Sequence, residues 1–153
     1  MRMESVEQSE DRILAEELAA LAATGGASGH LVRVVARLMR KNVHEVDLLA
    51  PLPFDEAVKR VSDVLGKTGH VVEAPPVRLG EGETVRVVVG GGAGGLNPVV
   101  VTARVLKVDG DNSQVRLRAA AKEGLIKQRA GEKTAVCLAA QVRRTTGADD
   151  AGE

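Results

Sequence analysis

Apolar and polar residues alternate along three stretches in the second half of the chain, which is the period-two pattern of a half-buried β-strand. The three predicted strands are Thr84–Val89, Val99–Val108 and Gln114–Ala121. The turn-forming letters VDGDNSQ separate the last two, so we expect an antiparallel hairpin there. Each strand has one apolar face, and the resulting meander needs a layer of helices to cover it.

Helical patterns flank these strands. A first helix is predicted where apolar residues recur at helical spacing, at Phe54, Val58, Val61 and Leu65. A short strand is expected in HVVEAPP, and a closing helix from about Ala130 to Arg143, although Ala135–Ala140 would also fit a buried strand. The predicted fold class is therefore α+β: an antiparallel three- to four-stranded sheet, covered on one face by two helices and preceded by an N-terminal helical hairpin.

The N-terminal third carries the two helical patterns of that hairpin. An acidic helix is expected over about 5–23 and, after TGGASG, a basic amphipathic helix over about 29–41. The prolines of APLP, Ala50–Pro53, disfavour helix in the residues before them and predict a boundary. We therefore expect an N-terminal helical segment over 1–50, an α+β domain over 51–144 and a disordered tail over 145–153.

The basic helix presents two candidate surfaces. Its charged face is a candidate contact for a partner or an anion, and consists of Arg33, Arg37, Arg40 and Lys41. Its apolar face is a candidate association surface, with Leu31, Val35 and Leu38. The acidic helix offers a simpler explanation for the charges, because a hairpin folded at TGGASG would pair acid with base inside the chain.

A second cluster of positive charge depends on the strand register. In an antiparallel meander, four arginines share the face opposite the apolar core, together with Thr102 and Gln114; they are Arg86, Arg104, Arg116 and Arg118. Like charges on neighbouring strands destabilise a sheet. This face is therefore expected to need water, acidic neighbours or a bound anion.

The run VVVGGGAGGLNPVVV contains G-x-G-x-x-G at Gly90, Gly92 and Gly95, the spacing of a dinucleotide-binding loop. Such a loop must lead from a strand into a helix, because the helix N-terminus holds the pyrophosphate. Here a β-branched run with Pro98 at its start follows, so a hairpin loop is predicted and no cofactor is expected. Whether Gly90–Gly95 also forms a flap over a ligand stays open.

Composition limits the chemistry further. The only aromatic residue is Phe54, so the core must be aliphatic and a base-stacking surface is disfavoured. The formal net charge is +0, so nucleic acid would have to be held by a local patch. The histidines are scattered, and Cys137 lies in TAVCLAA, where burial is expected. We assign no catalytic, cofactor-binding or metal-binding residue and expect a cytoplasmic protein that is not an enzyme.

From Phe54 to Val142 the order of elements resembles that of small bacterial helix-grip or TATA-binding-protein-like α-β-α domains, many of unknown function. FDEAVKRVSDVLGKTGH at the front and EGLIKQRAGEKTAVCLAAQV at the back carry the resemblance. It implies a role in binding partners and transfers no functional residue, because these domains share no catalytic signature. We predict a non-enzymatic binding or protein-interaction module whose partner is a protein or a second copy, bound through the N-terminal helices. The alternative is a nucleic-acid-binding protein that uses the basic helix.

Overall fold

The structure is a computed structural model that describes residues 6–24, 40–72, 82–91, 97–123, 129–147 and 149–150. Its described elements are α1 (Val6–Thr24), β1 (Arg40–Ala50), α3 (Phe54–Thr68), β2 (His70–Val72), β3 (Gly82–Gly91), β4 (Asn97–Lys107), β5 (Ser113–Glu123), α4 (Ala130–Thr146) and β6 (Asp149–Asp150). The strands form one six-stranded sheet in the order β2-β3-β4-β5-β1-β6, and all neighbours are antiparallel. The predicted α+β class is confirmed, but the sheet has more strands than the three or four expected.

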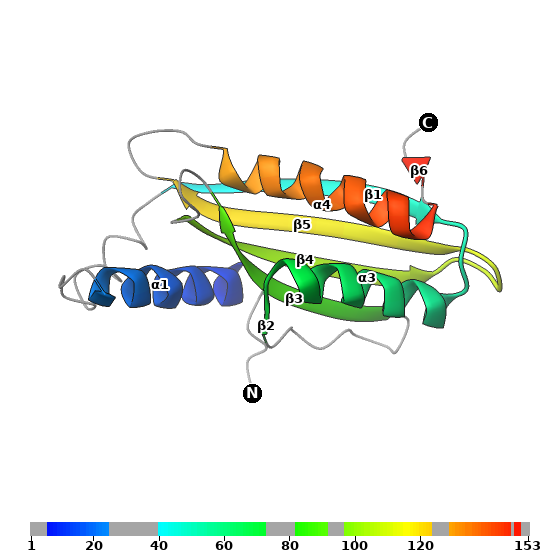
Figure 1. Cartoon of the computed structure of the whole chain (residues 1–153), viewed down its shortest axis with the longest axis horizontal. Coiled ribbons are helices and arrows are strands. Elements are labelled where there is room, and N and C mark those ends of the chain that lie inside the picture. The colour runs from blue at the N-terminus through cyan, green and yellow to red at the C-terminus, as the bar shows by residue number, and fades with distance from the viewer. Residues whose placement is uncertain are drawn as a thin grey trace.

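Helices pack on both faces of this sheet, with α3 and α4 on one face and α1 on the other (Figure 1). Side chains alternate between the two faces along each strand. In β4, Val99 and Val101 join the core with α3 and α4, whereas Val100 between them packs with Leu14 of α1. We call these surfaces the core face and the α1 face. The expected two helices on one face are α3 and α4. The packing of α1 on the opposite face was not expected.

The main core consists of Val, Leu and Ala, as a chain almost without aromatic residues requires. The buried helix residues in it include Ala57, Val61 and Leu65 from α3 and Ala135, Leu138 and Val142 from α4. Such small side chains allow α4 to approach the sheet closely. At Gly131 a Cβ would lie 2.9 Å from Asn42 Oδ1 and 3.2 Å from the Ala119 carbonyl oxygen. The start of α4 is therefore tightly fitted against β1 and β5.

The predicted meander is confirmed in β3, β4 and β5. The turn between β4 and β5 is held by Asp109, whose Oδ1 accepts hydrogen bonds of 2.8 Å from the backbone N–H groups of Asp111 and Asn112. The glycine run joins β3 to the antiparallel β4, so it leads into a strand and not into a helix. Residues 92–96 of that run lie outside the described residues.

Strand β1 is the main correction to the sequence prediction. Arg40 and Lys41, expected at the end of a basic helix, begin a strand that pairs with β5 from Arg40 opposite Glu123 to Ala50 opposite Ser113. The expected boundary before residue 51 is therefore wrong, because residues 40–50 belong to the same sheet as the later strands. The remaining candidates on the predicted helix, Leu31, Arg33, Val35, Arg37 and Leu38, lie outside the described residues.

In the C-terminal segment the predicted helix is confirmed, since Ala135–Ala140 is helical, but α4 continues past the expected end to Thr146. Gly147 ends this helix in the left-handed conformation, with φ of 71° and its N–H bonded to the Arg143 carbonyl oxygen. Asp149 and Asp150 pair with Leu49 and Leu48 of β1, so the predicted disordered tail contributes a short strand.

Candidate functional site

Positive side chains from three strands gather on the α1 face. The register places Arg86 of β3, Thr102 of β4 and Arg118 of β5 side by side, which confirms that these arginines share one face. Four residues further along β5, Lys122 lies opposite Lys41 of β1. We call the four cations Lys41, Arg86, Arg118 and Lys122 the cationic cradle. Like charges directly opposite one another destabilise a sheet, so the cradle needs an anionic neighbour.

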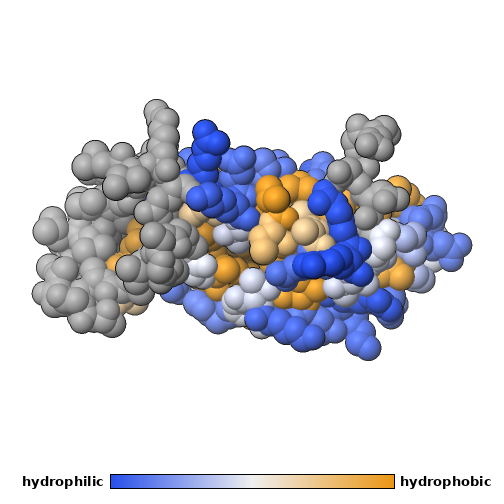
Figure 2. Space-filling view, turned by 45° about the horizontal axis from the view of Figure 1, so that its top comes forward, coloured by the Kyte–Doolittle hydropathy of each residue, from blue (hydrophilic) through white to orange (hydrophobic). Residues whose placement is uncertain are grey.

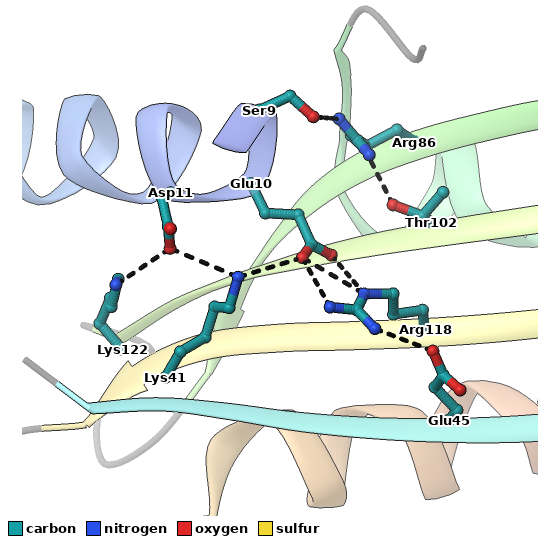
Figure 3. A network of polar contacts seen from close by, with 9 residues as sticks. All are labelled: Ser9, Glu10, Asp11, Lys41, Glu45, Arg86, Thr102, Arg118 and Lys122. Atoms are coloured by element: carbon teal, nitrogen blue, oxygen red, sulfur yellow. Dashed lines mark hydrogen bonds and ion pairs between the residues drawn. The ribbon is translucent and has the colours of Figure 1, made fainter. Parts of the chain in front are cut away.

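The first turns of α1 supply that neighbour, through three consecutive residues (Figure 3). Glu10 accepts hydrogen bonds from Arg118, with Nε 3.0 Å from Oε2 and Nη2 3.1 Å from Oε1. Its Oε1 also lies 3.5 Å from Lys41 Nζ. The Glu10 side chain is 0% exposed, so a fully buried carboxylate links two strands to the helix. Charge-assisted hydrogen bonds of this kind are stronger than neutral ones.

Asp11 extends the contact to the far end of the cradle. Its Oδ1 lies 3.0 Å from Lys122 Nζ and 3.4 Å from Lys41 Nζ. Burial alone would raise the pKa of Asp11, but the hydrogen bond from Lys122 and the charges of both lysines outweigh burial and hold the pKa below its usual value of 3.8. Asp11 is therefore stabilised as the carboxylate that the two lysines require.

Ser9 completes the set at the opposite side of the cradle. Arg86 is buried and donates from Nη1 to Ser9 Oγ at 2.8 Å and from Nε to Thr102 Oγ1 at 2.9 Å. A buried guanidinium needs such acceptors because loss of its hydration is costly. Three consecutive residues of α1 thus contact three strands. Ser9 contacts β3, Glu10 and Asp11 contact β5, and both carboxylates also contact Lys41 of β1.

Strand β1 adds acidic partners of its own. Arg118 Nη1 lies 2.8 Å from Glu45 Oε1, and Arg116 Nε lies 2.8 Å from Asp47 Oδ1. Burial lowers the pKa of Arg118, but the hydrogen bonds that it donates to Glu10 and Glu45 outweigh burial and raise the pKa above its usual value. The acidic neighbours expected for the arginine face therefore come from α1 and β1.

Among the described side chains, the apolar part of the α1 contact is small. Leu14 is buried with Val88 and Val100, and Ile13 and Val72 pack partly against this cluster. Residues Ala15 and Ala19 are also buried on α1 but bring little side-chain area. Charged and polar contacts therefore make up a large share of the described interface. Interfaces between domains of one chain are often polar in the same way.

Part of the arginine face beyond the described α1 contacts is exposed. Arg104 lies directly opposite Arg116 in the β4–β5 register and is exposed. Arg116 has Asp47 as its partner, and this hydrogen bond raises the pKa of Arg116 above its usual value. Arg104 adds a second positive charge at this point, so among the described residues the exposed part of the face next to the cradle has more cations than acids.

The predicted site residues divide accordingly. Lys41 lies in the cradle and Arg40 at the start of β1, while the rest of the predicted basic and apolar helix faces lies outside the described residues. Sequence reasoning found the arginine face and the need for acidic neighbours. It paired the acids of α1 with the basic segment, which holds for Lys41 but omits Arg118 and Lys122. The available signal was the spacing of Glu10 and Leu14. Residues four apart lie on the same face of a helix, so the acid and the leucine could be expected to contact the same surface.

Other chemistry is limited in the described part of the chain. There no group of three or more His, Cys, Asp or Glu side chains is placed to hold a metal ion. Cys137 was predicted to be buried but is exposed on α4, where Gln141 Nε2 lies 3.7 Å from its Sγ. None of the helices among the described residues has the length and apolar character to cross a membrane.

Comparison with known proteins gives one weak likeness. No protein family and no curated protein matched the chain. Among solved structures, the chain is similar to the Zhui aromatase/cyclase from a Streptomyces species, with 15% sequence identity over 71% of this chain and 88% of that chain and a TM-score of 0.32. A likeness at this TM-score carries no argument about activity. The helix-grip-like α+β arrangement therefore rests on the topology itself, an antiparallel sheet packed against the C-terminal helix α4.

The prediction that the chain is not an enzyme is not kept. A solved structure to which the chain is similar is, by its name, an enzyme, so the comparison gives that prediction no support. The same likeness is too weak to assign a reaction, a substrate or a catalytic residue to this chain.

Proposed function

We propose that this chain is a protein-interaction module whose cationic cradle binds acidic helices, and that α1 is the occupant supplied by the chain itself. The observation that carries the proposal is the buried carboxylate of Glu10, which is shared by Arg118 and Lys41. Lys41 and Lys122 are directly opposite one another, so the face is stable only with an anion against it. An acidic helix provides that anion together with an apolar side chain for Val88 and Val100.

The pattern that the cradle would recognise can be read from α1. Ser9, Glu10 and Asp11 provide the acceptors, and Leu14 follows Glu10 at a spacing of four residues on the same helix face. A partner helix with adjacent carboxylates and a leucine at this spacing would make the same contacts. Because the described apolar cluster is small, ion pairs hold much of the contact between α1 and the sheet. Ion pairs weaken with salt, whereas a large apolar interface would not, so α1 can be exchanged for a partner helix.

The proposal is tested by competition between α1 and a free copy of the same helix. A labelled peptide of residues 5–24 is titrated with the full-length chain, and binding is followed by fluorescence anisotropy. A chain with Glu10→Gln and Asp11→Asn holds its own α1 less well, so its cradle is open for a larger fraction of the time. Since apparent affinity scales with that fraction, this variant should bind the wild-type peptide about tenfold or more tightly than the wild-type chain does.

The matched control is a peptide with the same two substitutions, which should bind neither chain measurably. Equal affinity of both chains for the wild-type peptide would contradict the proposal, as would equal binding of the two peptides. A tighter complex with the variant chain is the result that a purely structural role of α1 does not predict.

Nucleic acid remains the alternative ligand for a basic surface of this chain. Arg33 and Arg37, on which that hypothesis mainly rests, lie outside the described residues, and Lys41 is in contact with Glu10 and Asp11. Titration with an oligonucleotide at low and moderate salt separates the two ligands. Tight binding to the wild-type chain that falls steeply with salt would favour nucleic acid over acidic helices.

A further inference from the structure

Strand β1 lies near one end of the sheet, and most of its outer edge has no strand beside it among the described residues (Figure 1). On its inner side it pairs with β5 over its whole length, from Arg40 to Ala50. On its outer side β6 pairs only with Leu48 and Leu49. In the described structure the backbone from Arg40 to Asp47 therefore presents outward N–H and C=O groups to which another strand can bind.

This edge lacks two of the features with which proteins usually prevent such pairing. No proline occurs from Arg40 to Ala50, and the register with β5 runs through consecutive pairs without a bulge. The segment also exposes an apolar side chain, since Val43 is 36% exposed. A long, regular and partly apolar edge is the usual receptor for strand addition.

We propose that this edge binds the same edge of a second copy of the chain, so that two sheets join into one. The charges of β1 favour this partner. A twofold axis through Val43, perpendicular to the sheet, makes the two β1 strands antiparallel and places Lys41 opposite Glu45 on both sides of the axis. Opposite charges at directly facing positions stabilise an antiparallel pair, and the two Val43 side chains meet at the centre. A symmetric contact of this kind is self-complementary, as homodimer interfaces are.

The same register uses residues on both faces. Asn42 would face His44 on the core face, while Lys41, Val43 and Glu45 lie on the α1 face. Lys41 already contacts Glu10 and Asp11, and Glu45 already contacts Arg118. The facing pairs of the dimer would therefore extend the polar network of one chain across the axis into the other.

The first test is the molar mass of the full-length chain by light scattering over a range of concentrations. The wild-type chain should be a dimer, and Val43→Lys should be a monomer, because two lysines would then meet at the axis. Val136→Lys is the matched control, since Val136 is 54% exposed on α4, away from the edge, and this variant should remain dimeric. Circular dichroism of all three chains shows whether each is folded.

The second test fixes the register and does not depend on a disruptive substitution. In a chain with Cys137→Ser, Val43→Cys places one thiol on each side of the axis, and mild oxidation should give a disulfide-linked dimer. Glu45→Cys in the same background is the control. Its two copies would be offset by four residues, about 13 Å at the strand rise of about 3.4 Å per residue, whereas a disulfide needs Cα atoms within about 7 Å.

A monomeric wild-type chain at all concentrations would overturn the inference, as would a dimeric Val43→Lys chain or equal cross-linking at positions 43 and 45. A dimer that persists in Val43→Lys would point to association elsewhere, such as the N-terminal region. These results are independent of the peptide competition above, because one experiment measures mass and the other measures the affinity of the cradle.

Discussion

Removal of the Glu10 charge should destabilise the protein more than removal of any exposed carboxylate. Glu10→Gln keeps the shape of the side chain but removes the charge that Arg118 and Lys41 share. Breaking a buried ion pair from one side typically costs about 3 to 5 kcal/mol. Here Arg118 keeps Glu45 and is 20% exposed, and Lys41 keeps Asp11, so we expect the lower value of about 2 to 3 kcal/mol.

The assay is urea unfolding followed by circular dichroism, because the chain has no Trp or Tyr to report by fluorescence. At a slope of about 2 kcal/mol per molar urea, the expected loss lowers the midpoint by about 1 M or more. The matched control is Glu56→Gln, which removes an exposed ion pair with Arg60 at a spacing of four residues on α3. This control should unfold at nearly the wild-type midpoint.

Two results would refute the reasoning. An unchanged midpoint in Glu10→Gln would mean that the charge of Glu10 contributes nothing to the stability of the protein. A raised midpoint would mean that the free-energy cost of desolvating the carboxylate is larger than the gain from its attraction to the cations. Some buried ion pairs behave in this way.

Four further predictions concern single residues. Because the pKa of Asp11 is depressed in the folded chain, its contribution is present above its usual value of 3.8 and is lost as the pH falls through the lower folded value; the protection of α1 amides, relative to their intrinsic exchange rate at each pH, should fall there and be unchanged between pH 6 and 8. Gly66→Ala should raise the unfolding free energy by about 0.5 to 1 kcal/mol, since its added Cβ meets no atom within 4 Å in α3. Gly69→Ala should lower the unfolding free energy instead, because the same atom would lie 2.3 Å from the Val88 carbonyl oxygen; thermal unfolding separates the two variants. Cys137 should react with an aromatic disulfide reagent in the native chain as fast as in urea, and a slow native reaction would contradict its exposure.

The local parts of the fold were predictable from the sequence. Alternation located β3, β4 and β5, the turn residues located the hairpin at Asp109, and helical spacing located α3 and α4. The shared face of Arg86 and Arg118 followed from the meander alone, because period-two alternation fixes the face once the register is known. These signals all lie within a short stretch of chain.

Strand β1 was not predictable in the same way. Its core face is apolar only in its second half, at Val46, Leu48 and Ala50, and begins with Asn42 and His44. Its partner β5 is far along the sequence, so no local turn pointed to the pairing. The acids of α1 were assigned to the adjacent basic segment for the same reason. Charge balance predicted that the arginine face would have acidic neighbours, but which acids these are depends on distant contacts.

The pairing of β1 with β5 also constrains the order in which the chain can fold. More than sixty residues separate Ala50 from its partner Ser113, and the ends of such a loop meet only at an entropic cost that slows folding. During synthesis α1 is made well before β5, the strand that carries Arg118 and Lys122. Until β5 has been made, the acidic side chains of α1 lack these two partners. The order of synthesis thus leaves a period in which a nascent chain can be bound through α1 before its own sheet is complete.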